Sequence, residues 1–387
     1  MSSRDDLGVA MDSLRRFSEW GRSDCAALWL DRSWDQEKGG FVEALDMTGA
    51  PMAGLPRRFR VQARQIFVLG ALTRAGWGDY TAQAVEAMAW LKPRAFMADG
   101  QPGWVHKLGD QGEILDAKRD LYDHAFILLA LATLHSITGD ADYIALADET
   151  LAFLDTDMVS AHGGYIESIG GAQLPRRQNP HMHLFEALIA LYDATGREDY
   201  LIRLKSLFDL FENVFYDAEN GVVREFFAAD WSRLSGREGL VCEPGHACEW
   251  VWLLAQYDRI TGADTQAIAQ RLYSVAMETG INSQTGLLFT SMGADGEVYD
   301  AGSRSWMQTE WVRAGLIMAS RGEGSADAAL DRCIRSSFEH HFLDDPAGGW
   351  MDQVDAEGGD ACDNMPTSTL YHVVGALLET ERSLELC

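Results

Sequence analysis

Apolar residues recur at helical spacing in many segments of the chain. In DHAFILLALATLHSI and HLFEALIALYDATG they return at positions i, i+3, i+4 and i+7, which places them on one side of a helix. Both segments carry enough apolar residues to pack against neighbours on two sides. The pattern predicts about twelve helices, at 5–30, 60–76, 79–94, 120–138, 141–156, 181–195, 198–214, 245–261, 264–279, 305–320, 325–341 and 368–383.

The predicted helices come in pairs that are joined by a recurring turn. Segments such as ITGDADY, ATGREDY and ITGADTQ place a glycine after one helix and a polar residue before the next. Glycine readily forms the left-handed cap at a helix C-terminus, and Asp or Ser caps a helix N-terminus. These turns therefore predict αα-hairpins.

A short segment of glycine and hydrophobic residues recurs six times between the hairpins. The distances between successive segments are 63, 61, 57, 65 and 63 residues, a near-constant period that indicates a repeat architecture. Each segment predicts a short strand or β-hairpin in a connecting loop. The segments contain Gly40, Gly103, Gly164, Gly221, Gly286 and Gly349.

Six helical hairpins can close into a ring, and we predict an all-α fold, an (α/α)6 barrel, as a single domain over 1–387. An open solenoid is the competing arrangement, but the first and last repeats lack the polar outer face of capping repeats. In a closed ring the loops between hairpins form the rim of a funnel. The starts of the inner helices then converge at that rim.

Charge and composition exclude several classes of partner. The net charge of −27 disfavours binding to nucleic acid or to anionic membrane surfaces, and it favours a neutral small molecule. We find no apolar run long enough to span a bilayer, and the start of the chain lacks the apolar core of a signal peptide. The six cysteines form no CxxC pair, which suits reduced thiols. A cytoplasmic protein is expected.

Polar residues stand near the start of every predicted inner helix, at the same phase of the repeat. Helices that converge would bring these side chains together around one cavity, although they are far apart in sequence. This cavity is where we expect the chemistry to occur. The residues are Arg64; Tyr122, Asp123 and His124; Asn179, His181, His183 and Glu186; His246 and Glu249; Trp306, Gln308 and Glu310; and His372.

Some of these histidines have an equally good structural explanation. His124 lies among apolar residues, where a histidine is often a hydrogen-bonded part of the core. His181 and His183 are two residues apart and point in different directions, so only one can enter the funnel, and the spacing of four from Asn179 favours His183. His246 and Glu249 lie on one helix face, so the carboxylate can orient the imidazole or hold a substrate hydroxyl.

Other chemistries are less well supported by the sequence. There is no HExxH motif, so a metal site would need ligands from several distant helices, and we predict no metal and no cofactor. There is no GxSxG motif for a serine nucleophile. Glycoside hydrolysis by two carboxyl groups stays open, with Glu249, Glu310 and Asp352 as candidates. A sugar-binding protein without catalysis also stays open.

Six motifs together resemble the N-acylglucosamine 2-epimerase superfamily over nearly the whole chain: RxQAR, LYDHAF, NPHMHLFEA, EPGHxxEW, WxQTE and a late YH. That superfamily includes acylglucosamine and cellobiose 2-epimerases and aldose–ketose isomerases that act on mannose or sulfoquinovose. The block DLYDHAFILLALA and the GREDY turn look most like the mannose isomerase branch.

The resemblance implies a role for individual residues. It makes His183, His246 and His372 catalytic, and it places Tyr122 and Trp306 in the substrate site, with Trp306 facing the sugar ring. Arg64, Asn179 and Glu249 would contact sugar hydroxyls. Cellobiose epimerases commonly carry a Trp five residues before the last histidine, where this chain has Thr367, and this departure argues against a stacked disaccharide.

The expected reaction is proton transfer within a monosaccharide. A histidine has an unperturbed pKa of roughly 6.5, so both of its protonation states are accessible near neutral pH. We expect His372 to remove the C2 proton and Arg64 to steady the resulting cis-enediolate, with His246 as the opposing acid or base and His183 assisting ring opening; the order of the first two can be reversed. Reprotonation at C1 gives a ketose, as from D-mannose to D-fructose, whereas reprotonation at C2 gives a 2-epimer. The sequence leaves open whether the protein is a monomer or a homodimer.

Overall fold

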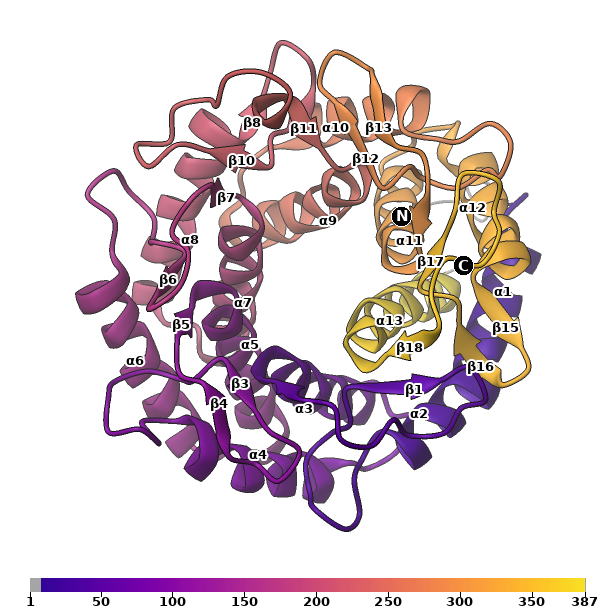
Figure 1. The fold of residues 1–387 in the computed structure, drawn as a ribbon. Helices are drawn as coiled ribbons and strands as arrows, with labels where there is room; N and C mark the ends of the chain where they lie inside the picture. Colours follow the sequence, from indigo (N-terminus) through magenta and orange to yellow (C-terminus); the bar gives the residue numbers. More distant parts are fainter. Residues whose placement is uncertain (1–7, 387) are drawn as a thin grey trace.

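Two concentric rings of helices make up the protein (Figure 1). The structure is a computed structural model, and it describes residues 8–386. The inner ring consists of α3 (Phe59–Arg74), α5 (Leu121–Thr138), α7 (Asn179–Thr195), α9 (Pro244–Thr261), α11 (Ser305–Ser320) and α13 (Leu370–Leu386). The outer ring consists of α1 (Met11–Trp20) with α2 (Ala26–Arg32), α4 (Thr81–Ala95), α6 (Asp142–Phe153), α8 (Glu198–Leu210), α10 (Gln266–Thr279) and α12 (Ala326–His340).

The ring closes on itself. Each inner helix contacts the next, and the last inner helix, α13, packs against the first, α3. Near this contact strand β1 (Ala44–Asp46) pairs antiparallel with β18 (Asn364–Pro366), so that the first and last repeats share a sheet. The (α/α)6 barrel predicted from the repeat is confirmed, and the open solenoid is excluded.

The inner helices begin within two residues of their predicted starts, whereas the first predicted helix differs more. That helix begins at Met11 rather than at residue 5; residues 8–10 form a turn, and 5–7 lie outside the described residues. The helical segment, predicted to end at residue 30, continues to Arg32 and is interrupted by a π-helical turn at Gly21–Cys25. Similar π-helical turns, at Leu154–Met158 and Phe211–Phe215, follow two other outer helices.

The glycines in the hairpin turns form the caps that the sequence predicts. Gly139, directly after α5, has a φ of 72°, and its N–H donates to the carbonyl of His135. A side chain in this conformation would be strained, which explains the need for glycine. The same left-handed cap occurs at Gly196 after α7 and at Gly262 after α9.

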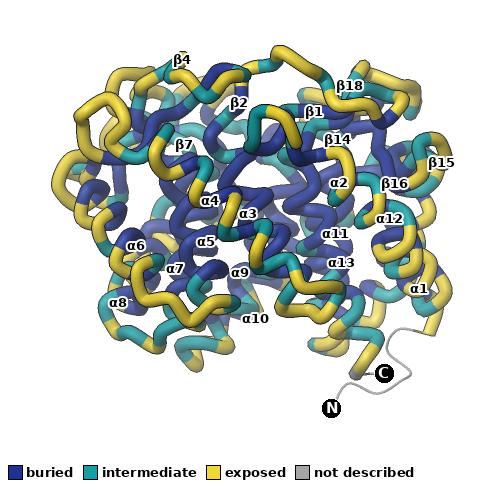
Figure 2. The backbone as a smooth tube through the Cα atoms, turned by 90° about the horizontal axis from the view of Figure 1, so that it is seen from below, coloured by how far each residue is buried: buried dark blue, intermediate teal, exposed yellow. Residues whose placement is uncertain are grey.

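Short antiparallel strands cover one face of the double ring (Figure 2). Most pairings join neighbouring repeats, as in β2–β3, β5–β6, β7–β10, β11–β12 and β14–β17, whereas β3–β4, β8–β9, β12–β13 and β15–β16 join the two arms of one hairpin. The remaining strands are β2 (Arg57–Arg58), β3 (Lys107–Leu108), β4 (Ile114–Asp116), β5 (Arg119–Asp120), β6 (Ser168–Ile169), β7 (Arg176–Arg177), β8 (Tyr216–Asp217), β9 (Val222–Val223), β10 (Phe226–Phe227), β11 (Val241–Cys242), β12 (Ser291–Gly293), β13 (Val298–Asp300), β14 (Ser303–Arg304), β15 (Phe342–Asp344), β16 (Ala347–Trp350) and β17 (Gln353–Val354).

Helix α5 corrects one expectation from the sequence. Its 18 residues are long and apolar enough, by length and composition, to cross a membrane. In the fold, however, α5 belongs to the inner ring, and α3, α6 and α7 cover most of its surface. Its hydrophobicity is therefore explained by burial on nearly all sides within the protein.

Candidate active site

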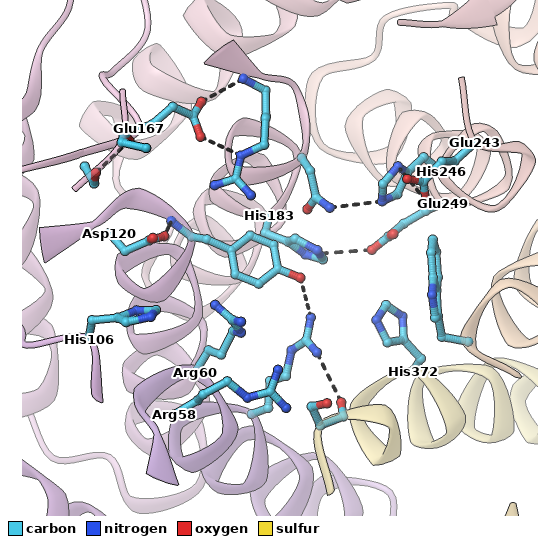
Figure 3. Close-up of a pocket in the computed structure, with 18 of the residues that line it drawn as sticks. Arg58, Arg60, His106, Asp120, Glu167, His183, Glu243, His246, Glu249 and His372 are labelled. Carbon is cyan, nitrogen blue, oxygen red and sulfur yellow. Dashed lines mark hydrogen bonds and ion pairs between the residues drawn. The ribbon is translucent and has the colours of Figure 1, made fainter. Parts of the chain in front are cut away.

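The starts of the inner helices surround one cavity of about 570 Å³ at the strand-bearing face. Every inner helix contributes at least one side chain to the lining, which is the convergence that a closed ring requires (Figure 3). The lining includes all eight residues that the sequence analysis assigned to catalysis or substrate binding: Arg64, Tyr122, Asn179, His183, His246, Glu249, Trp306 and His372.

Each of the three imidazoles is held by a carboxylate at its Nδ1 atom. His372 Nδ1 lies 2.7 Å from Glu310 Oε1, and His246 Nδ1 lies 2.9 Å from Glu225 Oε1. His183 Nδ1 lies 3.3 Å from Glu186 Oε2. A partner at Nδ1 fixes the orientation of an imidazole, so each ring is set in place by a buried acid.

The environment of His246 keeps its ring positively charged. Burial alone lowers the pKa of an imidazole, but here the charges of Glu225 and Glu243 outweigh it and raise the pKa of His246 to about 10. Glu243 Oε2 lies 3.6 Å from the same Nδ1 atom, and burial raises the pKa of Glu243 to about 7. His246 is therefore an imidazolium, and an acid, at neutral pH.

Asn179 faces the other nitrogen of this ring. The side-chain amide lies 3.1 Å from His246 Nε2, and Asn179 Oδ1 is buried without another hydrogen-bond partner. A charged imidazole donates from both nitrogens, and a half-turn of the amide exchanges its nitrogen and oxygen. With the oxygen toward Nε2, Asn179 accepts from the imidazolium, and both groups are satisfied.

The other two imidazoles, those of His372 and His183, are uncharged. Burial, together with the nearby charge of Arg64, keeps the pKa of His372 well below its usual range. Burial likewise lowers the pKa of His183 to about 4. Both rings are neutral at pH 7 and can accept a proton, so the cavity holds one acid and two potential bases.

Trp306 lies between the acid and one of the bases. Its ring centroid is 5.1 Å from that of His246 and 5.3 Å from that of His372. The rings of His183 and His372 are 6.4 Å apart, centroid to centroid. The three imidazoles therefore border a single space in which one monosaccharide can touch all of them.

A network of buried charges lies beneath the histidines. Arg313 Nη1 donates to Glu310 Oε2 over 2.9 Å, which leaves Glu310 Oε1 to accept from His372. Neither side-chain oxygen of Glu249 has a hydrogen-bond partner within the described residues, although both are buried. Burial and the neighbouring Glu310 raise the pKa of Glu249 well above its usual range. A protonated Glu249 can donate a hydrogen bond to a substrate hydroxyl.

Arg64 joins the first and last repeats at the cavity wall. Its Nη2 atom donates to the hydroxyl of Tyr122 over 2.7 Å, and its Nη1 atom donates to the carbonyl of Ser368 over 3.2 Å. No carboxylate lies within ion-pair distance of Arg64 in the described part of the chain. Its positive charge is therefore available to an oxyanion in the cavity.

Other polar residues at the helix starts serve the architecture. His124 Nε2 accepts from the backbone N–H of Trp104 over 3.1 Å, and His181 Nε2 accepts from that of Tyr165 over 3.0 Å. Gln62 and Gln308 satisfy backbone N–H groups of two other glycine-containing segments in the same way. The structural explanation of His124 and the exclusion of His181 from the funnel both agree with this arrangement.

We expect the substitution His124→Ala to reduce stability without changing the chemistry. It leaves the buried N–H of Trp104 without a partner, which costs about 1–3 kcal/mol of unfolding free energy. Denaturant unfolding measures the loss, and kcat per folded molecule should stay at the wild-type value. A large drop in kcat with unchanged stability would assign His124 to the reaction instead.

Two side chains considered for glycoside hydrolysis lie outside the cavity lining. Asp352 is buried and accepts from the hydroxyl of Thr369 over 2.7 Å, and Glu310 supports His372. Only Glu249 of the three candidates lines the cavity. A pair of carboxyl groups on opposite sides of a glycosidic bond is therefore not formed by these residues.

Three groups of side chains have the spacing that a metal ion needs. Their ligand atoms lie within 4.8 Å of one another in His183–Glu186–Glu249, Glu225–Glu243–His246 and Glu249–Glu310–His372. In each group an imidazole Nδ1 already faces a carboxylate, and Arg313 and His246 supply positive charge to the buried acids. The sequence showed none of these groups, because each combines residues from different helices or loops.

Glu225 is the residue of the site that sequence reasoning missed. We considered Glu249 as the residue that orients His246, but in the structure Glu225 does so and the imidazole nearest to Glu249 is His183, at 3.7 Å. Glu225 lies in the segment between β9 and β10, where the motif NGVVREFF places one acid among apolar residues. A single acid next to Arg224 in an otherwise apolar segment was the available signal.

The fold and the cavity define an enzyme that performs acid–base chemistry on a small polar molecule inside an (α/α)6 barrel. A family model described as N-acylglucosamine 2-epimerase (GlcNAc 2-epimerase) matches residues 39–376. The chain belongs to this family. It is therefore a sugar isomerase or 2-epimerase, an intramolecular oxidoreductase or an epimerase by reaction type.

Similar proteins include both reaction types. A mannose-6-phosphate isomerase from Rhizobium meliloti is 34% identical over 95% of this chain and 96% of its own length. A cellobiose 2-epimerase from Bacteroides fragilis is 25% identical, over 85% of this chain and 88% of its own. The crystal structure of a D-mannose isomerase superimposes with a TM-score of 0.83 at 24% identity, covering 100% of both chains, which supports the fold.

Proposed function

We propose that the protein is an aldose–ketose isomerase that interconverts D-mannose, or a close aldose, and D-fructose. The observation that carries the proposal is that His372 and His246 face one cavity on either side of Trp306, where burial lowers the pKa of His372 and neighbouring carboxylates raise that of His246. The similarity to an aldose–ketose isomerase over nearly the whole of both chains supports ketose formation as the outcome.

In this mechanism His372 is the base. The sugar ring first opens, with His183 assisting the proton transfer between the ring oxygen and the anomeric hydroxyl. Neutral His372 then takes the C2 proton, the electron pair forms the C1–C2 double bond, and O1 becomes an oxyanion. Arg64 and the His246 imidazolium stabilise this charge, and His246 gives its proton to O1.

The second half of the reaction returns His372 and His246 to their starting protonation states. The O2 hydroxyl gives its proton to the now neutral His246 and becomes the carbonyl oxygen of the ketose. The protonated His372 delivers its proton to C1. No proton is gained or lost overall. His372 is again neutral and His246 is again positively charged, as in the free enzyme.

Epimerisation at C2 is the second candidate function. It uses the same enediolate and differs only in that a proton reaches C2 from the opposite face. His246 lies across Trp306 from His372 and carries a proton, so it can deliver one. The cellobiose 2-epimerase relative supports this alternative.

Product analysis in deuterated water distinguishes the candidates. The protein is incubated with D-mannose, D-glucose, D-fructose or cellobiose, and the products are separated by chromatography. We expect D-mannose and D-fructose to interconvert, with deuterium at C1 of the fructose to the extent that the proton on His372 exchanges with solvent before its delivery to C1. Label at C2 of an epimeric aldose identifies an epimerase, whereas release of monosaccharide from cellobiose identifies a hydrolase. No conversion of any sugar contradicts both proton-transfer functions.

We also propose that the reaction needs no metal or cofactor, because Arg64, His246 and His372 supply the charge and the proton transfers. Prior dialysis against a chelator should leave the rate unchanged, and a rate restored only by added divalent cation would contradict this. We further propose that residues 1–387 form a single domain and that the protein is cytoplasmic, as the sequence leads us to expect.

A further inference from the structure

The cavity is richer in positive charge than the chain around it. Six arginine and lysine side chains line it against four carboxyl groups, whereas the whole chain has a net charge of −27. The net charge favours a neutral substrate, but a bound molecule interacts mainly with the charges within a few ångströms of it. The cavity therefore offers a positive surface inside an acidic protein.

Three of these six cations make close ion pairs in the described chain, Arg64 donates to Tyr122 and Ser368, and Arg60 stands beside His106. Arg58 pairs with Glu43, Lys118 with Asp120, and Arg177 with Glu167. For Arg60 the only carboxylate within ion-pair distance in the described chain is Asp123, at 3.7 Å. The guanidinium is 23% exposed and lines the cavity.

Asp123 holds a histidine beside this arginine. The carboxylate is fully buried, and its Oδ2 atom lies 2.6 Å from His106 Nδ1. The backbone of His106 is fixed as well, because its N–H donates to Asp116 and its carbonyl accepts from Phe59. His106 also lines the cavity, and its Nε2 atom has no hydrogen-bond partner in residues 8–386. The buried Asp123 thus holds the guanidinium of Arg60 and the imidazole of His106 next to each other.

This pair lies across the cavity from His372. Figure 3 shows Arg60 and His106 on one wall and His246 and His372 on the other. Tyr122 contacts both Arg60 and His183: its ring centroid is 5.3 Å from Arg60 Cζ and 5.0 Å from the ring of His183. An open-chain hexose that reacts at C1 and C2 therefore extends its other end toward Arg60.

We propose that Arg60 and His106 bind a phosphate group on the end of the aldose remote from C1 and C2. The proposal rests on the proposed isomerisation and narrows its substrate to a phosphorylated aldose. A phosphate monoester carries nearly two negative charges and three acceptor oxygens, and arginine binds such a group through two parallel hydrogen bonds. Arg304, the other weakly paired arginine of the lining, lies near the acidic Glu243, which repels an anion.

Kinetics with D-mannose and D-mannose 6-phosphate test the proposal. For the wild-type protein we expect kcat/KM to be at least about tenfold higher with the phosphorylated sugar, and to fall with added salt only for that sugar. Arg60→Gln and His106→Gln should each lower kcat/KM for D-mannose 6-phosphate at least about tenfold more than they lower it for D-mannose. Arg60→Lys should retain part of the preference. Arg237→Gln, at an exposed site, is the control and should match the wild type.

Three results overturn the proposal. They are a wild-type preference for unphosphorylated D-mannose, an equal loss for both sugars in Arg60→Gln, and loss of the preference in Arg304→Gln but not in Arg60→Gln. Binding of inorganic phosphate, followed by calorimetry, separates this site from the reaction: affinity should drop at least about tenfold in Arg60→Gln. If phosphate binds in this way but neither sugar is converted, the proposed function fails and the anion site stands.

Discussion

The substitution His372→Asn is expected to lower kcat for D-mannose by roughly 10²- to 10⁴-fold, the usual effect of removing a well-placed acid or base. Asn occupies a similar space and can still accept or donate a hydrogen bond, but it cannot take the C2 proton. Burial and Arg64 hold His372 in the neutral form, and Glu310 fixes its ring. Steady-state product formation and wash-out of deuterium from C2 measure the loss.

His162→Asn is the matched control for this experiment. His162 is exposed in the loop before β6 and lies outside the cavity lining, so the same change of side chain there should leave kcat unaltered. If His372→Asn exchanges the C2 proton at the wild-type rate, His372 is not the base. In that event the same measurement on His183→Asn identifies the other neutral imidazole as the candidate.

The second large effect is expected from Glu225→Gln, through the pH dependence of the reaction. The raised pKa of His246 keeps the imidazolium present at neutral pH and lost only as the pH rises through about 10. Without the charge of Glu225 that pKa falls by roughly 1–2 units, the value of a hydrogen bond to a charged group. The alkaline limb of the kcat/KM profile should move down by the same amount, so that activity at pH 10 falls about 5- to 50-fold while activity at pH 7 falls much less.

A second acid in the same loop region provides the control for this profile. Glu238 is exposed and makes no contact with the cavity, so Glu238→Gln should leave both limbs where they are in the wild type. The acidic limb reports His372, whose lowered pKa places it below pH 6.5 in all three proteins. An alkaline limb that stays in place in Glu225→Gln would mean that His246 is not the acid or that another group sets its charge.

The ring and its helices could be predicted because they follow local rules. The 3.6-residue period and the glycine after each inner helix are written in consecutive residues, and the six glycine segments report the repeat directly. His183, His246 and His372 could be placed in one cavity because all three stand at the same phase of that repeat. The repeat symmetry alone therefore indicated which residues lie close together in space.

The supporting residues could not be predicted in the same way. Glu225 and His106 lie in the recurring glycine segments, whose period does not report which helix each side chain meets. Whether Glu249 faces His246 or His183 depends on the rotation of α9 against α7, which sequence spacing does not report. Net charge does not report the local charge of the cavity either, because the cations of Arg60 and Arg64 are concentrated there while the acids are spread over the surface.

The contact between α3 and α13 has a consequence for how this protein can evolve. Gln65 and Arg64 of the first repeat donate to the carbonyls of Thr367 and Ser368 in the last, so the bonds at the seam belong to the active site itself. An open solenoid tolerates the gain or loss of a repeat at its end. Here a ring of five or seven hairpins would have a different diameter and would separate His372 from Arg64. Catalysis itself therefore holds the number of repeats at six.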